Sequence, residues 1–314
     1  MKRVFKLLGL VIFVLLAFSS CKEENFDINF YDDYNDKPYD KVAFLMAHNA
    51  FASAAHNIGG LFKNQDISIP KQLEFGVRGL MMDVYYKSSY EGADQIFMCH
   101  GSNCGENGGL QDEAFPRAFV HYLNMIKTFM DENPEAVITI ILQDGAIPSS
   151  KMGLVWQQVV DAGLDEQYFN PAGSDWNVMS NGSWPTIQWM IDNQKRLVIF
   201  SNTTENQFFP YQWTYSVEND YGSVGFQQCP KRDESDALDN TAKLLFVMNH
   251  FRSFLLGVDA TADNNYNQLI KKVDNYCKPE AFRYPNFVAV DFVEQGKNGG
   301  ALKVVNELNM RDDW

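Results

Sequence analysis

Residues 136–144 read AVITIILQD, a continuous run of apolar and β-branched side chains that ends in two polar residues. Such a run is typical of a strand buried on both faces, because helices cover both sides of a parallel sheet. The segment therefore predicts a central strand of a parallel sheet.

Further apolar segments lie on both sides of this strand in the sequence, at residues 42–51, 79–86, 95–102, 196–202, 244–250 and 286–292. Apolar residues that recur three and four positions apart predict helices between many of them. The expected helices cover residues 69–75, 114–130, 152–162, 187–191, 267–276 and 301–308. Apolar strands that alternate with amphipathic helices indicate parallel βα units.

Chain length favours one barrel. From residue 41 onward about 270 residues remain, which suits one large barrel or two small domains. No glycine-rich dinucleotide fingerprint follows any expected strand, which weakens the case for an open doubly wound sheet. We expect an α/β fold, a distorted (β/α)8 barrel of the TIM type in a single domain.

The first residues have the pattern of an export signal. Lys2, Arg3 and Lys6 precede an apolar run at residues 7–18, and small residues then lead to Cys21. A Cys at this position predicts a lipoprotein signal at residues 1–20 and lipidation of Cys21; the alternative is an ordinary signal peptide followed by an unrelated Cys. We then expect residues 21–40 to form a flexible acidic stalk and residues 41–314 to form the barrel domain. We expect a bacterial outer membrane lipoprotein, on the periplasmic or the cell-surface face.

The net charge limits the partners. The chain carries −14 at pH 7, and removal of the three basic signal residues takes this to −17. Such a surface argues against binding to nucleic acid and against docking on anionic lipid by charge alone. We expect a monomer that meets the membrane through its N-terminal lipid anchor.

Four cysteines remain after Cys21, and in an exported chain an even number suggests two disulfides. Three pairings are possible. We expect Cys99–Cys104, which closes a short loop, together with Cys229–Cys277. Free buried thiols are the alternative, and the irregular spacing makes a zinc site less favoured.

Polar residues gather at the ends of the expected strands. In a β/α barrel these ends meet at one mouth, where functional residues lie. The residues concerned are His48, Asp83, His100, Gln143, Asp144, Asn202, His250 and Asp291.

Two histidines on different strand ends suit a general base and a general acid at neutral pH. Oxygen atoms of Asn49, Asp83 and Gln143 or Asp144 suit a hard cation such as Ca²⁺. Asp291 is placed to orient one imidazole, as carboxylates commonly do. The alternative is that each histidine is a hydrogen-bonded structural residue.

Eight motifs, in order, resemble the X-domain of phosphatidylinositol-specific phospholipase C. They are AHNAF, QLEFGVRGLMMDVYY, FMCHGS, VITIILQD, NQKRLVIFS, YQWTYSVENDYG, CPKRDES and NFVAVDFVEQGKNGGA. The later ones are similar to the secreted and plant branch of that family, and the resemblance covers residues 42–306. The resemblance implies a distorted barrel that cleaves inositol phospholipids to diacylglycerol and an inositol phosphate, often by way of a cyclic phosphate.

The resemblance also implies residue roles. His48 matches the base for the inositol 2-hydroxyl, His100 the acid for the leaving glycerol oxygen, and Asp291 the carboxylate that pairs with the base. Asn49 and Asp83 match two calcium ligands.

Two positions depart from the family pattern. Met81 and Gln143 stand where Glu is expected, so any calcium site should be weak or completed by Asp144 and substrate phosphate. No cluster of Lys and Arg suits a polyphosphorylated ring, which favours phosphatidylinositol or a glycosylated relative. The alternatives are a phosphodiesterase for soluble glycerophospho- or glycosyl-phosphodiesters and a non-catalytic binding barrel.

Overall fold

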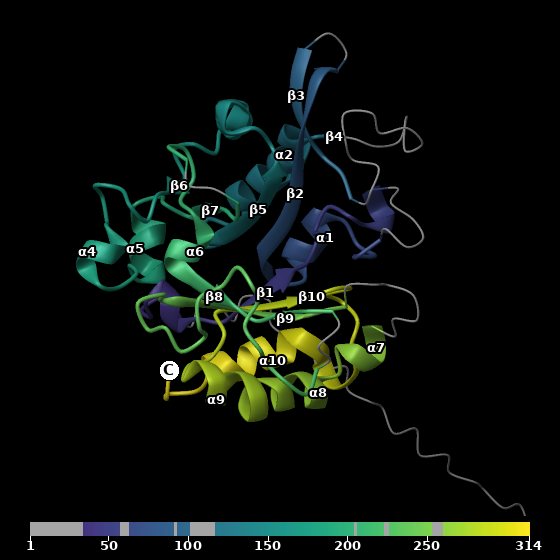
Figure 1. Ribbon diagram of the computed structural model, residues 1–314, viewed down its shortest axis with the longest axis vertical. Coiled ribbons are helices and arrows are strands. Elements are labelled where there is room, and N and C mark those ends of the chain that lie inside the picture. Colours follow the sequence, from purple (N-terminus) through teal and green to yellow (C-terminus); the bar gives the residue numbers. More distant parts are fainter. Residues whose placement is uncertain are drawn as a thin grey trace, which may run out of the picture.

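The strands of the computed structural model form one curled sheet, in which eight strands follow one another in the order β6-β7-β5-β2-β1-β10-β9-β8 (Figure 1). The structure describes residues 34–56, 63–90, 93–100, 117–203, 206–222, 226–252 and 260–314. All pairings along this path are parallel. The strands are β1 (Phe44–Ala47), β2 (Val77–Tyr90), β5 (Ile138–Ala146), β6 (Tyr168–Phe169), β7 (Leu197–Ser201), β8 (Ser216–Glu218), β9 (Leu245–His250) and β10 (Phe287–Val290).

This arrangement confirms a single α/β domain of the distorted barrel type. Residues 138–142 of β5 are all buried, as its apolar run predicts. Within the described residues no pairing joins β6 to β8, so the sheet stays open between these two short strands. Strands of two and three residues are too short to show a period, which is why the sequence did not predict them.

Most expected helices are present. In α2 (Phe119–Glu132) the buried residues Phe119, Leu123, Ile126 and Met130 form the predicted apolar face. The helices α8 to α10 lie along the side of the sheet formed by β9 and β10 (Figure 1). The other helices are α1 (Ile69–Glu74), α3 (Met152–Asp161), α4 (Val178–Asn181), α5 (Ile187–Asp192), α6 (Gln212–Tyr215), α7 (Ala260–Asp263), α8 (Tyr266–Lys272), α9 (Lys278–Ala281) and α10 (Gly300–Asn309).

In the described part of the chain no helix combines the length and the hydrophobicity that crossing a membrane requires.

The segment expected as a third barrel strand has a different place. β3 (Ala93–Met98) runs antiparallel to β2, with Met98 opposite Val84, and β4 (Arg117–Ala118) pairs with its other edge. The long β2 continues beyond the barrel, and β3 returns along it (Figure 1). His100 therefore reaches the barrel mouth at the end of a hairpin and not at the end of a parallel strand.

The start of the packed domain also differs from the expectation. Tyr39 is fully buried and stacks against Trp184, with ring centroids 4.7 Å apart. The amide of Tyr39 donates to the carbonyl of Pro185 at 2.9 Å, and the amide of Ile187 donates to the carbonyl of Lys37 at 3.1 Å. Burial of this one tyrosine ring therefore holds the segment around Tyr39 on the barrel, within the range expected as a stalk.

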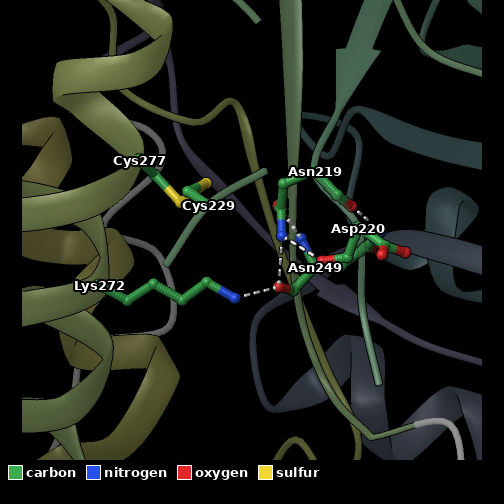
Figure 2. Close-up of a disulfide and its surroundings, with 6 residues drawn as sticks. All are labelled: Asn219, Asp220, Cys229, Asn249, Lys272 and Cys277. Atoms are coloured by element: carbon green, nitrogen blue, oxygen red, sulfur yellow. Dashed lines mark hydrogen bonds between the residues drawn. A yellow bond between two sulfur atoms is a disulfide. The ribbon is translucent and has the colours of Figure 1, made fainter. Parts of the chain in front are cut away.

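One disulfide joins Cys229, between β8 and β9, to Cys277 beyond α8, as Figure 2 shows. This pairing was predicted and is confirmed. The other predicted pair includes Cys104, and Cys104 lies outside the described residues, as do Cys21 and residues 1–20.

Candidate active site

His48 and Asp291 come together because their strands are neighbours. β1 and β10 pair in register, Ala47 beside Val290, so the next residue of each strand lies at the same level. His48 Nδ1 is 2.8 Å from Asp291 Oδ1. A carboxylate only accepts hydrogen bonds, so Nδ1 of the neutral imidazole carries the proton and Nε2 is left as a base.

Two asparagines hold Asp291 in place. Asn64 Nδ2 donates to Asp291 Oδ1 at 2.9 Å, and Asn264 Nδ2 donates to the backbone carbonyl of Asp291 at 2.7 Å. Both asparagines are 2% exposed. The sequence gives no signal for either asparagine, because neither stands at the end of an apolar strand and neither belongs to a segment with a helical or strand period. Only their contacts mark them as part of the site.

His100 lies near the His48–Asp291 pair and is connected to it by hydrogen-bonded asparagine side chains. Asn49 Nδ2 is 3.1 Å from His100 Nε2 and 3.3 Å from Asn64 Oδ1. Asn49 has a φ of 44°, in the left-handed region that Asn tolerates better than most residues. This turn directs the side chain from the end of β1 toward His100. Two buried amides thus connect the two imidazoles.

Asp83 lies next to Gln143 across the β2–β5 pairing. Its Oδ1 atom is buried and has no hydrogen-bond partner among the described residues. Burial raises the pKa of Asp83 from its ordinary value of 3.8 to about 6, and the nearby His48 opposes this shift. A carboxyl group in such a position gains from a cation.

The expected calcium ligands do not all face the same place. Asn49 Oδ1, like Asp83 Oδ1, is buried without a hydrogen-bond partner in the described chain. Asp144 instead accepts hydrogen bonds from Ser201 Oγ at 2.6 Å and from the amide of Thr203 at 3.2 Å. The donor set that fits a hard cation is therefore Asn49, Asp83 and Gln143, with one carboxylate.

Among the described residues, no group of three or more His, Cys, Asp or Glu side chains is placed to hold a metal ion. A set of one carboxylate and two amides carries little negative charge, and the affinity for a hard cation falls with the charge of its ligands.

A cavity of about 420 Å³ opens beside Asp83 in the middle of β2, at the carboxyl ends of β5 and β7. Its walls combine carboxylates and amides with aromatic rings and one arginine. They consist of Asp83, Tyr85, Gln143, Gly145, Ala146, Asn202, Thr203, Tyr211, Trp213, Arg232 and Glu234.

The positive charge of Arg232 is balanced by two carboxylates. It contacts Glu218 and Glu234, each at 2.9 Å, and Glu218 is 2% exposed. Burial acts to lower the pKa of Arg232, but the two carboxylates outweigh it and raise the pKa above the ordinary value. The cavity therefore contains one arginine whose charge is already neutralised.

The other histidines do not join this site. His250 Nε2 is 2.8 Å from the carbonyl oxygen of Asp263, and burial, with Lys272 nearby, holds its pKa well below the usual range. His56 is 5% exposed, with its ring edge-on to Tyr122. His121 lies on α2 beside the same tyrosine.

Comparison with known proteins identifies relatives over most of the chain. A family model described as PI-PLC X matches residues 34–309. A PI-PLC X domain-containing protein of Arabidopsis thaliana is 31% identical over 287 residues, covering 88% of this chain and 63% of the plant protein. The chain thus spans less than two thirds of that relative. PI-PLC X domain-containing protein 1 of Arthroderma benhamiae is 27% identical and is covered to 89%, as is this chain.

Solved structures share the fold. The phosphatidylinositol-specific phospholipase C of Listeria monocytogenes matches with a TM-score of 0.58 and 16% identity, covering 88% of this chain and 96% of that one. A Staphylococcus aureus phosphatidylinositol-specific phospholipase C matches with a TM-score of 0.54 and 12% identity, covering 88% and 93%. At these identities the likeness establishes the barrel architecture alone.

Proposed function

This chain belongs to the PI-PLC X-domain family, and from that premise we propose that it is a phosphodiesterase of the phospholipase C type. Its proposed reaction cleaves the glycerol–phosphate bond of an inositol phospholipid to diacylglycerol and a cyclic or hydrolysed inositol phosphate. The observation that carries the proposal is the His48–Asp291 pair, connected to His100 through Asn64 and Asn49.

In the first step His48 Nε2 takes the proton of the inositol 2-hydroxyl while that oxygen attacks phosphorus. Asp291 stabilises the imidazolium that results, because it accepts the Nδ1 proton at 2.8 Å. The bond between phosphorus and the glycerol oxygen breaks, and His100 protonates that oxygen. Diacylglycerol leaves, and the phosphate remains as a cyclic diester on the inositol ring.

Hydrolysis of the cyclic phosphate reverses the two roles. His100, now neutral, takes a proton from water as the water attacks phosphorus, and His48 returns its proton to the inositol oxygen. Both imidazoles then have their starting protonation. Without this second step the enzyme would need proton exchange with solvent before the next turnover.

We propose Asn49, Asp83 and Gln143 as ligands for a weakly bound Ca²⁺ ion. When bound, the ion would supply positive charge beside the substrate phosphate. The buried Asn49 Oδ1 and Asp83 Oδ1 atoms have no hydrogen-bond partner among the described residues, which supports this assignment, whereas Asp144 already accepts hydrogen bonds from Ser201 and Thr203.

The cavity beside Asp83 supports a headgroup without extra phosphates. Arg232 is bound by Glu218 and Glu234, and Asp83 adds a third carboxyl nearby. A phosphorylated ring would meet no surplus positive charge here, whereas amides and aromatic rings suit hydroxyl groups and ring faces. We therefore propose phosphatidylinositol or a glycosylated relative as substrate.

The second candidate is a phosphodiesterase for soluble glycerophospho- or glycosyl-phosphodiesters. The exposed large apolar residues of the described chain are Val160, Met179, Phe282 and Met310, and none of them lines the cavity. This observation favours a substrate that need not be taken from a bilayer. A binding barrel without catalysis would have no use for the acid–base pair.

We propose that a lipid on Cys21 anchors the protein, as a monomer, to the bacterial outer membrane. Tethering raises the local concentration near lipid and so replaces a basic docking face, which a chain of this net charge lacks.

The test uses the full-length chain in mixed micelles of detergent and lipid. We expect release of diacylglycerol from phosphatidylinositol and none from phosphatidylcholine, and His48→Ala and His100→Ala should each slow it by at least ~100-fold. His121→Ala is the matched control, because His121 lies on α2 away from the cavity, and it should keep full activity. Histidine variants as active as wild type would overturn the mechanism.

Two further arms separate the alternatives. Cleavage of glycerophosphoinositol without cleavage of phosphatidylinositol would establish the second candidate. A chelator and Asp83→Asn should each reduce the rate; if neither does, calcium is not used.

A further inference from the structure

Phe251 lies flat on the imidazole of His48, with ring centroids 3.7 Å apart and an interplanar angle of 4°. We propose that Phe251 is a positioning residue that fixes the plane of the His48 ring and so aims Nε2 at the substrate hydroxyl. This inference rests on the proposed function, because it assigns His48 the role of general base.

The strand register explains how Phe251 arrives there. Ala47 of β1 pairs with Val290 of β10, and Val290 pairs with His250 of β9. The residues that follow these three are His48, Asp291 and Phe251, so the base, its carboxylate and the aromatic ring come from one level of three neighbouring strands. The amide of Gly222 donates to the carbonyl of Phe251 at 3.2 Å and holds its backbone.

The bond to Asp291 is not sufficient to orient the imidazole. The covalent bond at Cγ and the hydrogen bond at Nδ1 hold two points of the imidazole, and rotation of the ring plane about the line through these points remains. A parallel aromatic contact removes this rotation, and Phe251 is 5% exposed and therefore held in its own packing. The contact adds a second effect, because the face of an aromatic ring attracts a cation and so stabilises the imidazolium formed during the reaction.

The support for Phe251 continues into the cavity wall. Tyr221 packs on Phe251 with ring centroids 4.9 Å apart, and the guanidinium of Arg232 lies 5.3 Å from the Tyr221 ring. The same guanidinium lies 5.6 Å from the ring of Trp213, which lines the cavity. A chain of contacts through Arg232 and Tyr221 thus connects the cavity wall to Phe251, the ring that would orient His48.

A second pair of the same kind provides a matched control. Phe226 stacks on His250 with centroids 3.9 Å apart and an interplanar angle of 20°. His250 is bound to the carbonyl of Asp263 and takes no part in the proposed reaction. Replacement of Phe226 therefore removes a similar stack without touching the catalytic base.

The first arm of the experiment measures the stack itself by NMR, on the full-length chain in detergent with ¹³Cε1-labelled histidine. A ring above an imidazole shifts its signal upfield, so Phe251→Leu should move the His48 signal downfield and leave that of His250 in place. Phe226→Leu should do the reverse. An unmoved His48 signal in Phe251→Leu would overturn the proposal.

The second arm measures hydrolysis of phosphatidylinositol. Phe251→Leu should lower kcat by about 10-fold, since small misplacements of catalytic groups have effects of this order, with KM changed less than about 3-fold. Phe251→Tyr, which keeps the flat face, should restore kcat to within about 2-fold of wild type. If the leucine variant unfolds, Phe251→Met carries the same expectation, because it fills the space without a ring.

The outcomes separate this inference from the proposed function. A wild-type protein without activity on any phosphodiester refutes the proposed function. An active wild type with an equally active Phe251→Leu or Phe251→Met refutes the positioning role. A loss of kcat that Phe251→Tyr does not restore also refutes it, because the aromatic face would then not be the cause.

Discussion

Asp83 holds a carboxyl group in surroundings that oppose its ionisation. Burial raises its pKa from the ordinary 3.8 to about 6, although His48 acts in the opposite direction. Between these two values the folded protein binds more protons at Asp83 than the unfolded chain does. The free energy of unfolding therefore falls as the pH rises through this window, and the loss persists at higher pH.

Asp83→Asn should remove that loss. At pH 8 we expect the variant to be more stable than wild type by about 3 kcal/mol, and near pH 4 the two should be nearly equal. Urea unfolding at both pH values, in the presence of a chelator, measures the difference. A gain of the same size at both pH values would show that ionisation of Asp83 is not its cause.

The two residues at the end of β5 illustrate how alternation along a strand divides roles. Gln143 lines the cavity beside Asp83, whereas Asp144 turns to Ser201 and Thr203 on the β7 side. The sequence predicts both residues as metal ligands, because it does not show which of two adjacent polar residues faces the cavity. That depends on which strands lie on each side of β5.

At the scale of elements, α8 places a buried cation beneath β9. Lys272 is 2% exposed, and its Nζ donates to the carbonyl of Asn249 at 2.7 Å (Figure 2). No carboxylate pairs with it among the described residues. Burial lowers its pKa to about 8. From pH 8 to its ordinary value of 10.5 the unfolded chain binds more protons here, so stability rises with pH in this window.

Lys272→Met should therefore stabilise the protein at pH 7 by about 2 kcal/mol, after allowance for the lost hydrogen bond, and the gain should shrink by pH 10. Asn219 Nδ2 still donates to the same carbonyl at 3.2 Å. Thermal and urea unfolding at the two pH values measure the effect. The neighbouring exposed Lys271→Met is the control and should change stability by less than about 0.5 kcal/mol. A destabilised Lys272→Met at pH 7 would contradict the argument.

Strands and helices with a clear apolar pattern were predictable from the sequence. Which strands pair with one another, and in which direction, was not predictable. The strands β1, β5, β7, β9 and β10 and the helix α2 follow from their apolar patterns. The antiparallel course of β3 does not, because an apolar run has the same appearance in either direction. β6 and β8 were missed because they are short.

At the scale of the whole molecule, no pairing of the described residues joins β6 to β8, and the disulfide holds the segment next to β8. Cys229 and Cys277 are 48 residues apart in sequence, and both are buried. Closing a loop of this length restricts the unfolded chain. The disulfide also holds the connection between β8 and β9 against the helical segment from which Lys272 and Cys277 project (Figure 2).

Replacing both cysteines with alanine should lower the free energy of unfolding by about 4 kcal/mol, the value expected for a loop of this length. Urea unfolding of the double variant and of wild type measures the loss. Cys229→Ala alone should have an effect of similar size, because one cysteine cannot close the loop. Unchanged stability in either variant would show that the disulfide does not constrain the unfolded chain.

The sequence by itself determined the parallel α/β barrel and the family, because long apolar runs and motifs in a fixed order depend on local order along the chain. Only the tertiary structure placed Asn64 against Asp291, Phe251 on His48 and Gln143 beside Asp83, and packed residues 34–40 on the barrel. These contacts join segments up to some two hundred residues apart. They depend on strand register and order in the sheet, which side chains distant in sequence decide together when the core packs.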